Sequence, residues 1–151
     1  MSLPSGKYLI RNLANGYSIA RPLREEKSLL PKPIMSLSSA CVADVHPWLF
    51  EQCESGTYKI KAGGSATGVK DGLVFAMLME NDKPSDWKVE PCPQMGENCF
   101  TIDNVDDCGG WSLPNTDKEV QVAVEPIITT RSLPPLFMHH QVFVITPAPE
   151  E

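Results

Sequence analysis

This sequence contains five cysteines and a pair of adjacent histidines, residue types that can bind zinc or, in the case of cysteine, form disulfides; a zinc site would use Cys92, Cys99, Cys108 and the histidine pair. The histidines are His139 and His140, and the cysteines stand at positions 41, 53, 92, 99 and 108. Structural zinc sites usually contain ligand pairs at a tight spacing such as Cys-x2-Cys, and no such pair occurs here. We therefore expect no metal and no other cofactor, and we interpret the cysteines as small, half-buried hydrophobic residues.

The state of the thiols is predicted from the number of cysteines and from the first residues of the chain. Residues 1–7 contain no apolar signal segment. An odd number of cysteines is typical of free thiols in a reducing compartment, so we expect a cytoplasmic protein. Cys92 and Cys99 flank the turn 93–98 and could face each other across a hairpin, which leaves one disulfide open as an alternative.

Catalytic motifs are absent from the sequence. It has no Gly-x-Ser-x-Gly elbow, no Gly-x-x-x-x-Gly-Lys-Ser/Thr phosphate loop and no His-Glu-x-x-His motif. Asp103, Asp106 and Asp107 lie close to the glycine pair 109–110, but acidic residues ahead of glycines usually belong to a turn. We interpret the two histidines as a solvated or backbone-bonded pair. The protein is therefore predicted not to be an enzyme.

Charge and composition exclude several classes of partner. The 151 residues include 13 Lys and Arg against 19 Asp and Glu, a net charge of −6, which argues against nucleic acid or an anionic membrane as partner. No run approaches the roughly 18 consecutive apolar residues of a membrane span. The length fits one domain, and we expect a monomer.

Proline and glycine interrupt the chain too often for long helices. Proline is 14 of 151 residues, about 9%, where roughly 5% is usual. Short helices are predicted only around residues 41–46 and 83–86. Strand-forming runs are frequent and indicate an all-β protein. The clearest are residues 8–10, 58–61, 74–79, 120–124 and 142–146.

Two strand patterns alternate along the chain three times. Opening strands begin with the aromatic residues Tyr8, Tyr58 and Phe100, and closing strands begin with Trp48, Trp87 and Phe143. We predict three repeats, over residues 6–52, 56–91 and 98–147, each with two further strands between its opening and closing strands. Four strands in each repeat make twelve, and three such units can close a barrel around a pseudo-threefold axis. This arrangement resembles the β-trefoil, whereas a two-sheet sandwich would not explain the threefold pattern.

The repeats differ in length, and the differences predict where binding occurs. The opening and closing aromatic residues are 40 positions apart in the first repeat, 29 in the second and 43 in the third. The additional residues fall mainly in 23–33 and 129–140. Loops longer than the scaffold needs are frequent binding sites, so these two segments are the candidates for function.

Each loop supports two interpretations. Pro31 and Pro33 stiffen the first loop in an extended form, which suits the cleft of a protease because proteases bind substrates as added strands. The alternative is a solvated connector. In the second loop, residues 136–138 are apolar. They could form an exposed partner surface, or they could fold back and close the end of the barrel.

The order of these segments resembles the fungal β-trefoil serine protease inhibitors of the cospin type, the mycospins. The resemblance covers nearly the whole chain and rests on residues 6–10, 21–32, 110–114, 120–127 and 142–147. It implies a cytosolic fungal protein, defensive or regulatory in role, that reversibly inhibits trypsin-like or chymotrypsin-like serine proteases. It also implies that the loop between the second and third strands, here 23–33, occludes the active site of the protease.

The resemblance places the protease-binding residues in one short run, with Arg24 as a further basic residue nearer the start of the loop. That run is Lys27, Ser28, Leu29, Leu30, Pro31 and Lys32. Lys32 would suit a specificity pocket with an aspartate at its floor, and Leu29 or Leu30 would suit a hydrophobic pocket. Both Leu30 and Lys32 precede a proline.

Three alternatives on the same fold remain open: a cysteine protease inhibitor, a carbohydrate-binding lectin, and a protein–protein module with no protease target. Fungal cysteine protease inhibitors of β-trefoil type are similar in size and in their last strand. Carbohydrate-binding β-trefoils usually repeat a Gln-x-Trp near the end of each unit. Here neither Trp48 nor Trp87 follows such a glutamine, and the third copy reads Gln141-Val-Phe143, so three equivalent sugar pockets are not expected.

Overall fold

The computed structural model describes residues 3–21, 29–38, 47–79, 83–106 and 109–148. This part of the chain is all-β, as predicted, with two single turns of 3-10 helix, η2 (Pro93–Met95) and η3 (His139–Gln141). Residues 83–86 are not helical, and residues 41–46 lie outside the described part. Among the described residues, no helix has the length and apolar character needed to cross a membrane. The strands are β1 (Gly6–Asn12), β2 (Ser18–Ala20), β3 (Lys32–Pro33), β4 (Met35–Leu37), β5 (Trp48–Gln52), β6 (Tyr58–Ala62), β7 (Ser65–Lys70), β8 (Leu73–Ala76), β9 (Trp87–Pro91), β10 (Cys99–Asn104), β11 (Gly110–Ser112), β12 (Ala123–Glu125) and β13 (Phe143–Pro147).

Six strands close into a barrel. β1 pairs with β5, β5 with β6, β6 with β9, β9 with β10 and β10 with β13, and β13 pairs again with β1. All of these pairs are antiparallel, and closure leaves no free edge in the ring. In chain order the six are the opening and closing strands that the sequence analysis identified.

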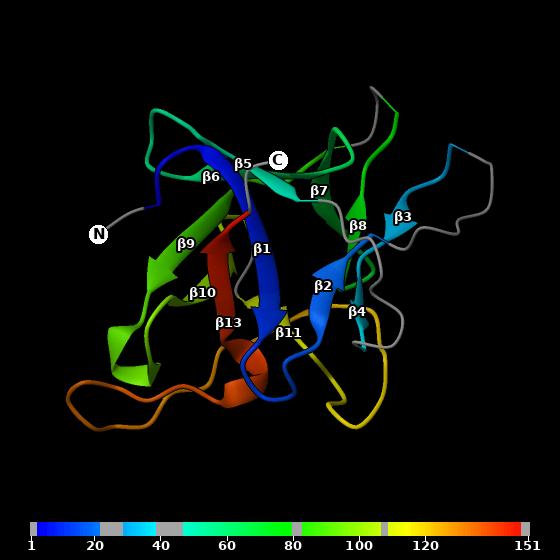
Figure 1. The fold of residues 1–151 in the computed structure, drawn as a ribbon. Helices are drawn as coiled ribbons and strands as arrows, with labels where there is room; N and C mark the ends of the chain where they lie inside the picture. The colour runs from blue at the N-terminus through cyan, green and yellow to red at the C-terminus, as the bar shows by residue number, and fades with distance from the viewer. Residues whose placement is uncertain (1–2, 22–28, 39–46, 80–82, 107–108, 149–151) are drawn as a thin grey trace.

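The other strands form three antiparallel pairs at one end of the barrel. They are β2 with β4, β7 with β8, and β11 with β12. In Figure 1 the barrel strands β1, β9, β10 and β13 lie to the left, and β2, β4, β7 and β8 lie to the right. β8 also pairs with β3 and with β12, and Met35 of β4 forms a bridge with Gln121, so the three pairs meet one another.

A closed ring of main-chain hydrogen bonds marks the centre where the pairs meet. The N–H of Ile34 donates to the carbonyl of Val74 (3.1 Å), that of Val74 to Val122 (2.9 Å), and that of Val122 to Ile34 (2.8 Å). All three side chains are fully buried. The arrangement is therefore threefold, with one residue from each repeat.

The described chain has thirteen strands where twelve were predicted. The difference arises in the third strand of the first repeat. Ile34 turns its N–H and carbonyl toward the central ring, and this divides the predicted strand into β3, which pairs with β8, and β4, which pairs with β2.

The core of the barrel repeats the same set of side chains three times. The opening strands bury an aromatic residue and, two positions later, an isoleucine, because alternate residues of a strand face the same side. The closing strands bury the aromatic residue that begins each of them. These side chains are Tyr8, Ile10, Tyr58, Ile60, Phe100, Ile102, Trp48, Trp87 and Phe143.

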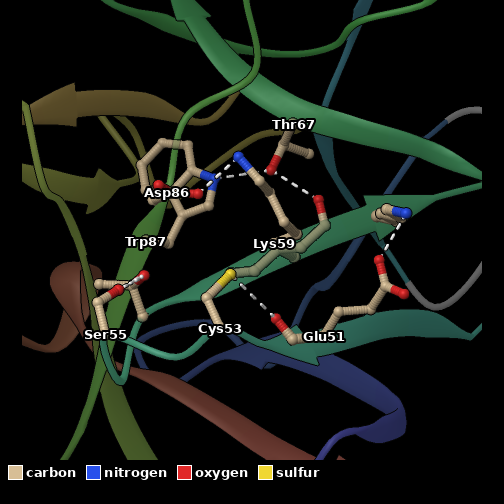
Figure 2. Close-up of polar contacts among 10 residues, drawn as sticks. Glu51, Cys53, Ser55, Lys59, Thr67, Asp86 and Trp87 are labelled. Carbon is tan, nitrogen blue, oxygen red and sulfur yellow. Dashed lines mark hydrogen bonds and ion pairs between the residues drawn. The ribbon is translucent and has the colours of Figure 1, made fainter.

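Polar contacts link the strands of the second repeat (Figure 2). The indole N–H of Trp87 donates to the hydroxyl of Thr67 (2.9 Å), and that hydroxyl donates to the carbonyl of Ile60 (2.8 Å). Lys59 Nζ lies 2.6 Å from Asp86 Oδ1. The first two contacts are buried and join β6, β7 and β9, while the ion pair is partly exposed.

Candidate functional site

The described end of the first loop exposes two leucines. Leu29 and Leu30 are 63% and 64% exposed, and Pro31, which follows them, is half-buried. Arg24, Lys27 and Ser28, the other basic and hydroxyl residues that the sequence analysis named, lie outside the described residues. The structure therefore brings the two leucines to the surface together.

Lys32 does not join the leucines at the surface. It is 3% exposed and lies in β3, opposite Ala76 of β8. The neighbouring pair is Pro33 with Phe75, and the pairing fixes this end of the loop against the sheet. In this conformation the Lys32 side chain is not available to a specificity pocket, because burial between strands holds it back from solvent. The sequence pattern did not reveal this, since lysine is usually exposed.

The second loop, between β12 and η3, divides its apolar residues between surface and core. Phe137 packs against a small cluster of Cys92, Cys99 and Val142. Leu136 and Met138 on either side are exposed. Residues 136–138 therefore divide: Phe137 folds back onto this cluster, as one interpretation predicted, while its neighbours face solvent, and a partner for them stays a prediction.

Hydrogen bonds across its base brace the second loop. Thr129 and Phe137 form an isolated antiparallel bridge. The N–H of Thr130 donates to the carbonyl of Leu136 (2.9 Å), and the N–H of Leu136 donates to the hydroxyl of Thr130 (2.9 Å). Thr130 and Leu136 are thus joined twice, which closes residues 130–136 into a compact loop.

Further contacts hold the tip of this loop. The hydroxyls of Thr130 and Ser132 lie 2.6 Å apart, and the hydroxyl of Ser132 donates to the carbonyl of Pro134 (3.0 Å). Arg131, between the two hydroxyl residues, is exposed, and Leu133 is 96% exposed. Arg131 is not among the binding residues predicted from the sequence. The signal available was its run Thr-Thr-Arg-Ser-Leu-Pro-Pro, a lone cation between hydroxyl residues and a proline pair.

The cysteines resolved in the structure are free thiols. Cys92 and Cys99 are buried side by side at the ends of β9 and β10, where the N–H of Cys92 donates to the carbonyl of Cys99 (2.8 Å). The disulfide that the sequence left open is therefore not formed. Burial, with a smaller effect of Cys99, raises the pKa of the Cys92 thiol to about 12. Cys53 is partly exposed, and Cys41 and Cys108 lie outside the described residues.

The histidine pair forms part of the scaffold. His139 and His140 begin η3, and the carbonyl of His140 accepts hydrogen bonds from the N–H of Leu113 (3.1 Å) and from the side-chain amide of Asn12 (3.1 Å). Within the described ranges, no three His, Cys, Asp or Glu side chains gather as metal ligands would.

Of the predicted acidic cluster, Asp106 is exposed, Asp107 lies outside the described residues, and Asp103 has an unusual environment. It lines a shallow hollow together with Lys88 and Gly109. Burial, helped by the charge of Glu90 and opposed by that of Lys88, raises the pKa of its carboxyl to about 6. The backbone beside it is tight, since a methyl group on Gly110 would meet Asp103 Oδ1 at 2.7 Å. Such packing accounts for the burial without a ligand.

Comparisons with known proteins agree on one family. The family model described as peptidase inhibitor I66 matches residues 1–147. A serine protease inhibitor from Lentinula edodes is 33% identical over 144 residues, which are 95% of this chain and 97% of that protein. The structure of a proteinase inhibitor from Coprinopsis cinerea matches with a TM-score of 0.91 and 32% identity, over 97% of this chain and all of that one.

More distant structures share the fold alone. The ricin B-like lectin from Macrolepiota procera, solved with lactose, matches with a TM-score of 0.66 and 18% identity, over 98% of this chain and all of the lectin. The Rhizoctonia solani agglutinin matches with a TM-score of 0.69 and 15% identity, over 98% of this chain and 99% of the agglutinin.

Proposed function

This chain belongs to the peptidase inhibitor I66 family, and we propose that it reversibly inhibits trypsin-like or chymotrypsin-like serine proteases. The family and the relatives that match along nearly the whole chain are protease inhibitors and not enzymes. The Lentinula edodes relative is a serine protease inhibitor, which supports a serine protease as the target of this chain. Free thiols at Cys53, Cys92 and Cys99 support a reducing, cytoplasmic location.

We assign the scaffold to the β-trefoil. The closed barrel of six strands, the three strand pairs beside it, and the ring formed by Ile34, Val74 and Val122 support this assignment. A closed barrel keeps its loops in fixed positions, because every barrel strand is paired on both sides. A protease-binding loop on such a scaffold loses little conformational entropy when it binds.

The observation that carries the proposal is the exposure of Leu29 and Leu30 directly before an anchored strand. The loop leaves Pro31 and enters β3, where Lys32 pairs with β8. A protease cleft would bind the exposed run as an added strand, with Leu30 or Leu29 in a hydrophobic specificity pocket. Pro31 fixes its own φ and limits the conformations that the run can adopt.

The proposal is tested by titrating the protein against chymotrypsin, trypsin and papain and following residual activity. Leu30→Asp should weaken chymotrypsin inhibition by about 100-fold, as loss of an interface anchor does. The matched control is Val105→Asp, since Val105 is 50% exposed and lies outside both long loops. The control should leave inhibition unchanged, and both variants should melt within a few degrees of the unchanged protein.

Other outcomes of the same titration contradict parts of the proposal. Unchanged chymotrypsin inhibition by Leu30→Asp would remove the first loop from the binding site. Loss of papain activity would assign the protein to the cysteine protease inhibitors on the same fold. If all three proteases stay active, protease inhibition through the leucines is wrong, and a glycan array would then test sugar binding.

A further inference from the structure

We propose that the braced segment 129–137 is a second protease-binding loop, in which Arg131 enters the specificity pocket of a trypsin-like protease. The inference rests on the proposed function for the class of partner, but it concerns a different segment and a different pocket chemistry. It predicts that one chain can inhibit a trypsin-like and a chymotrypsin-like protease at separate places.

Arg131 has the side chain that such a pocket requires. Trypsin-like proteases recognise an arginine or a lysine with an aspartate at the floor of the pocket. The Arg131 side chain is exposed and makes no hydrogen bond or ion pair with any described residue. Its guanidinium can therefore pair with a carboxylate of a partner without first breaking a contact inside this protein.

The backbone on both sides of Arg131 is already fixed. Thr130 is bound to Leu136 through its N–H and through its hydroxyl, and its hydroxyl also lies 2.6 Å from that of Ser132. The Ser132 hydroxyl in turn reaches the carbonyl of Pro134. A loop ordered in this way before binding loses less entropy when it docks, so its affinity rises without additional contacts.

The same contacts make the loop a poor substrate. Attack by the protease serine on the Arg131 carbonyl would form an ester, and a proton passed through the protease histidine would release the amine of Ser132. The contacts of Ser132 with Thr130 and Pro134 keep that amine beside the ester. The amine can then attack the ester, return its proton and restore the peptide bond, so cleavage is reversible and net hydrolysis is slow.

The barrel anchors both ends of the loop. On the side after the tip, the Gln94 side-chain amide donates to the carbonyl of Pro135 (2.8 Å), and Phe137 packs on the buried cluster. On the side before the tip, Gln141 accepts from the N–H of Ile128 (2.9 Å) and donates to the carbonyl of Pro126 (2.8 Å). Gln141 is itself 1% exposed, so this connection is shielded from water.

The described end of the first loop and the Arg131 loop lie on different sides of the molecule. In Figure 1 the orange segment that precedes η3 extends below and to the left of β9 and β10, whereas β3 lies at the upper right. The barrel stands between them. A protease bound at the leucines would therefore leave the Arg131 loop accessible to a second protease.

The experiment measures inhibition constants for bovine trypsin and chymotrypsin with four forms of the full chain. Arg131→Ala should weaken trypsin inhibition by about 100-fold, the scale of an interface anchor, and Arg131→Lys should retain most of it because lysine fits the same pocket. The matched control, Lys118→Ala, removes an exposed cation from the β11–β12 loop and should leave trypsin inhibition unchanged. Each of these variants should inhibit chymotrypsin as the unchanged protein does.

The two proposals fail in distinguishable ways. The Arg131 inference is wrong, whatever the leucine variant shows, if the unchanged protein does not inhibit trypsin. It is also wrong if Arg131→Ala inhibits trypsin as well as the unchanged protein does, or if Lys118→Ala weakens trypsin inhibition as much as Arg131→Ala does. If Leu30→Asp keeps full chymotrypsin inhibition while Arg131→Ala loses trypsin inhibition, the first loop fails and the second stands. Light scattering after gel filtration should show one inhibitor with one trypsin and one chymotrypsin, and a complex with only one protease at a time would overturn the separate placement of the loops.

Discussion

The indole of Trp111 meets the indole of Trp87 edge to face, with ring centroids 5.5 Å apart and ring planes at 82°. Trp111 also contacts Trp48 at 5.8 Å and Phe143 at 6.0 Å between centroids. These three partners are the aromatic residues that begin the three closing strands. A single side chain of β11 thus contacts the first closing-strand residue of all three repeats.

Replacing Trp111 should therefore damage the whole fold. Trp111→Ala should lower the free energy of unfolding by about 3–5 kcal/mol, the usual loss when a large buried aromatic side chain is removed. Trp111→Phe, which keeps one ring, should cost less. Urea unfolding followed by circular dichroism measures both. A loss below about 1 kcal/mol in the alanine variant, the scale of an ordinary substitution, would contradict the central position of this ring.

The hydroxyl of Thr67 should stabilise the folded protein through its hydrogen bonds more than through the volume that it fills. Thr67→Val keeps the shape but removes the acceptor of the Trp87 indole N–H and the donor to Ile60. A buried group left without its partner costs about 1–3 kcal/mol, so we expect a loss of that order in the free energy of unfolding. Thr57→Val is the control, because its hydroxyl contacts only the exposed hydroxyl of Ser55. Equal effects of the two substitutions would refute this account.

Asp103 should make stability depend on pH in the weakly acidic range. Its carboxyl has a pKa of about 6 in the folded protein against an ordinary value of 3.8. Between these values the folded protein binds more protons than the unfolded chain, so the free energy of unfolding falls as pH rises from about 4 to 6. The stabilisation is complete below pH 4 and lost above pH 6.

Asp103→Asn removes this titration. Relative to the unchanged protein, the variant should gain stability as pH rises through this window. Lys88→Gln should steepen the dependence, because Lys88 lowers the pKa of Asp103. Urea unfolding at pH 4, 5, 6 and 7 provides the measurement. A constant difference between the Asn variant and the unchanged protein would show that Asp103 titrates alike in both states.

The buried thiols should react slowly. The thiolate is the reactive form, and burial raises the pKa of Cys92 to about 12 and also raises the pKa of Cys99. With iodoacetamide at pH 8, peptide mass spectrometry should find Cys53 modified before Cys92 and Cys99, which should stay protected until urea is added. Early modification of Cys92 in the native protein would be inconsistent with its packing against Val142.

The sequence alone determined the strands and their threefold order. Tyr8 and Ile10, like Tyr58 and Ile60, occupy alternate positions and face the same core, and this period is a local property of a strand. The repeats could be recognised because each must supply the same aromatic residues to one barrel. The sequence also located the two long loops, since their additional residues appear as a difference in spacing.

Tertiary structure decided which residues in those loops are accessible. Lys32 is buried because β8, more than forty residues later, pairs with its strand, while Leu29 and Leu30 lie just beyond that pairing. Arg131 is held at a fixed tip because Thr130 meets Leu136, and because Gln94, in the turn between β9 and β10, reaches the far side of the loop. The burial of Lys32 and the contact from Gln94 depend on partners more than forty residues away in the chain, and no local pattern of residue types contains that information.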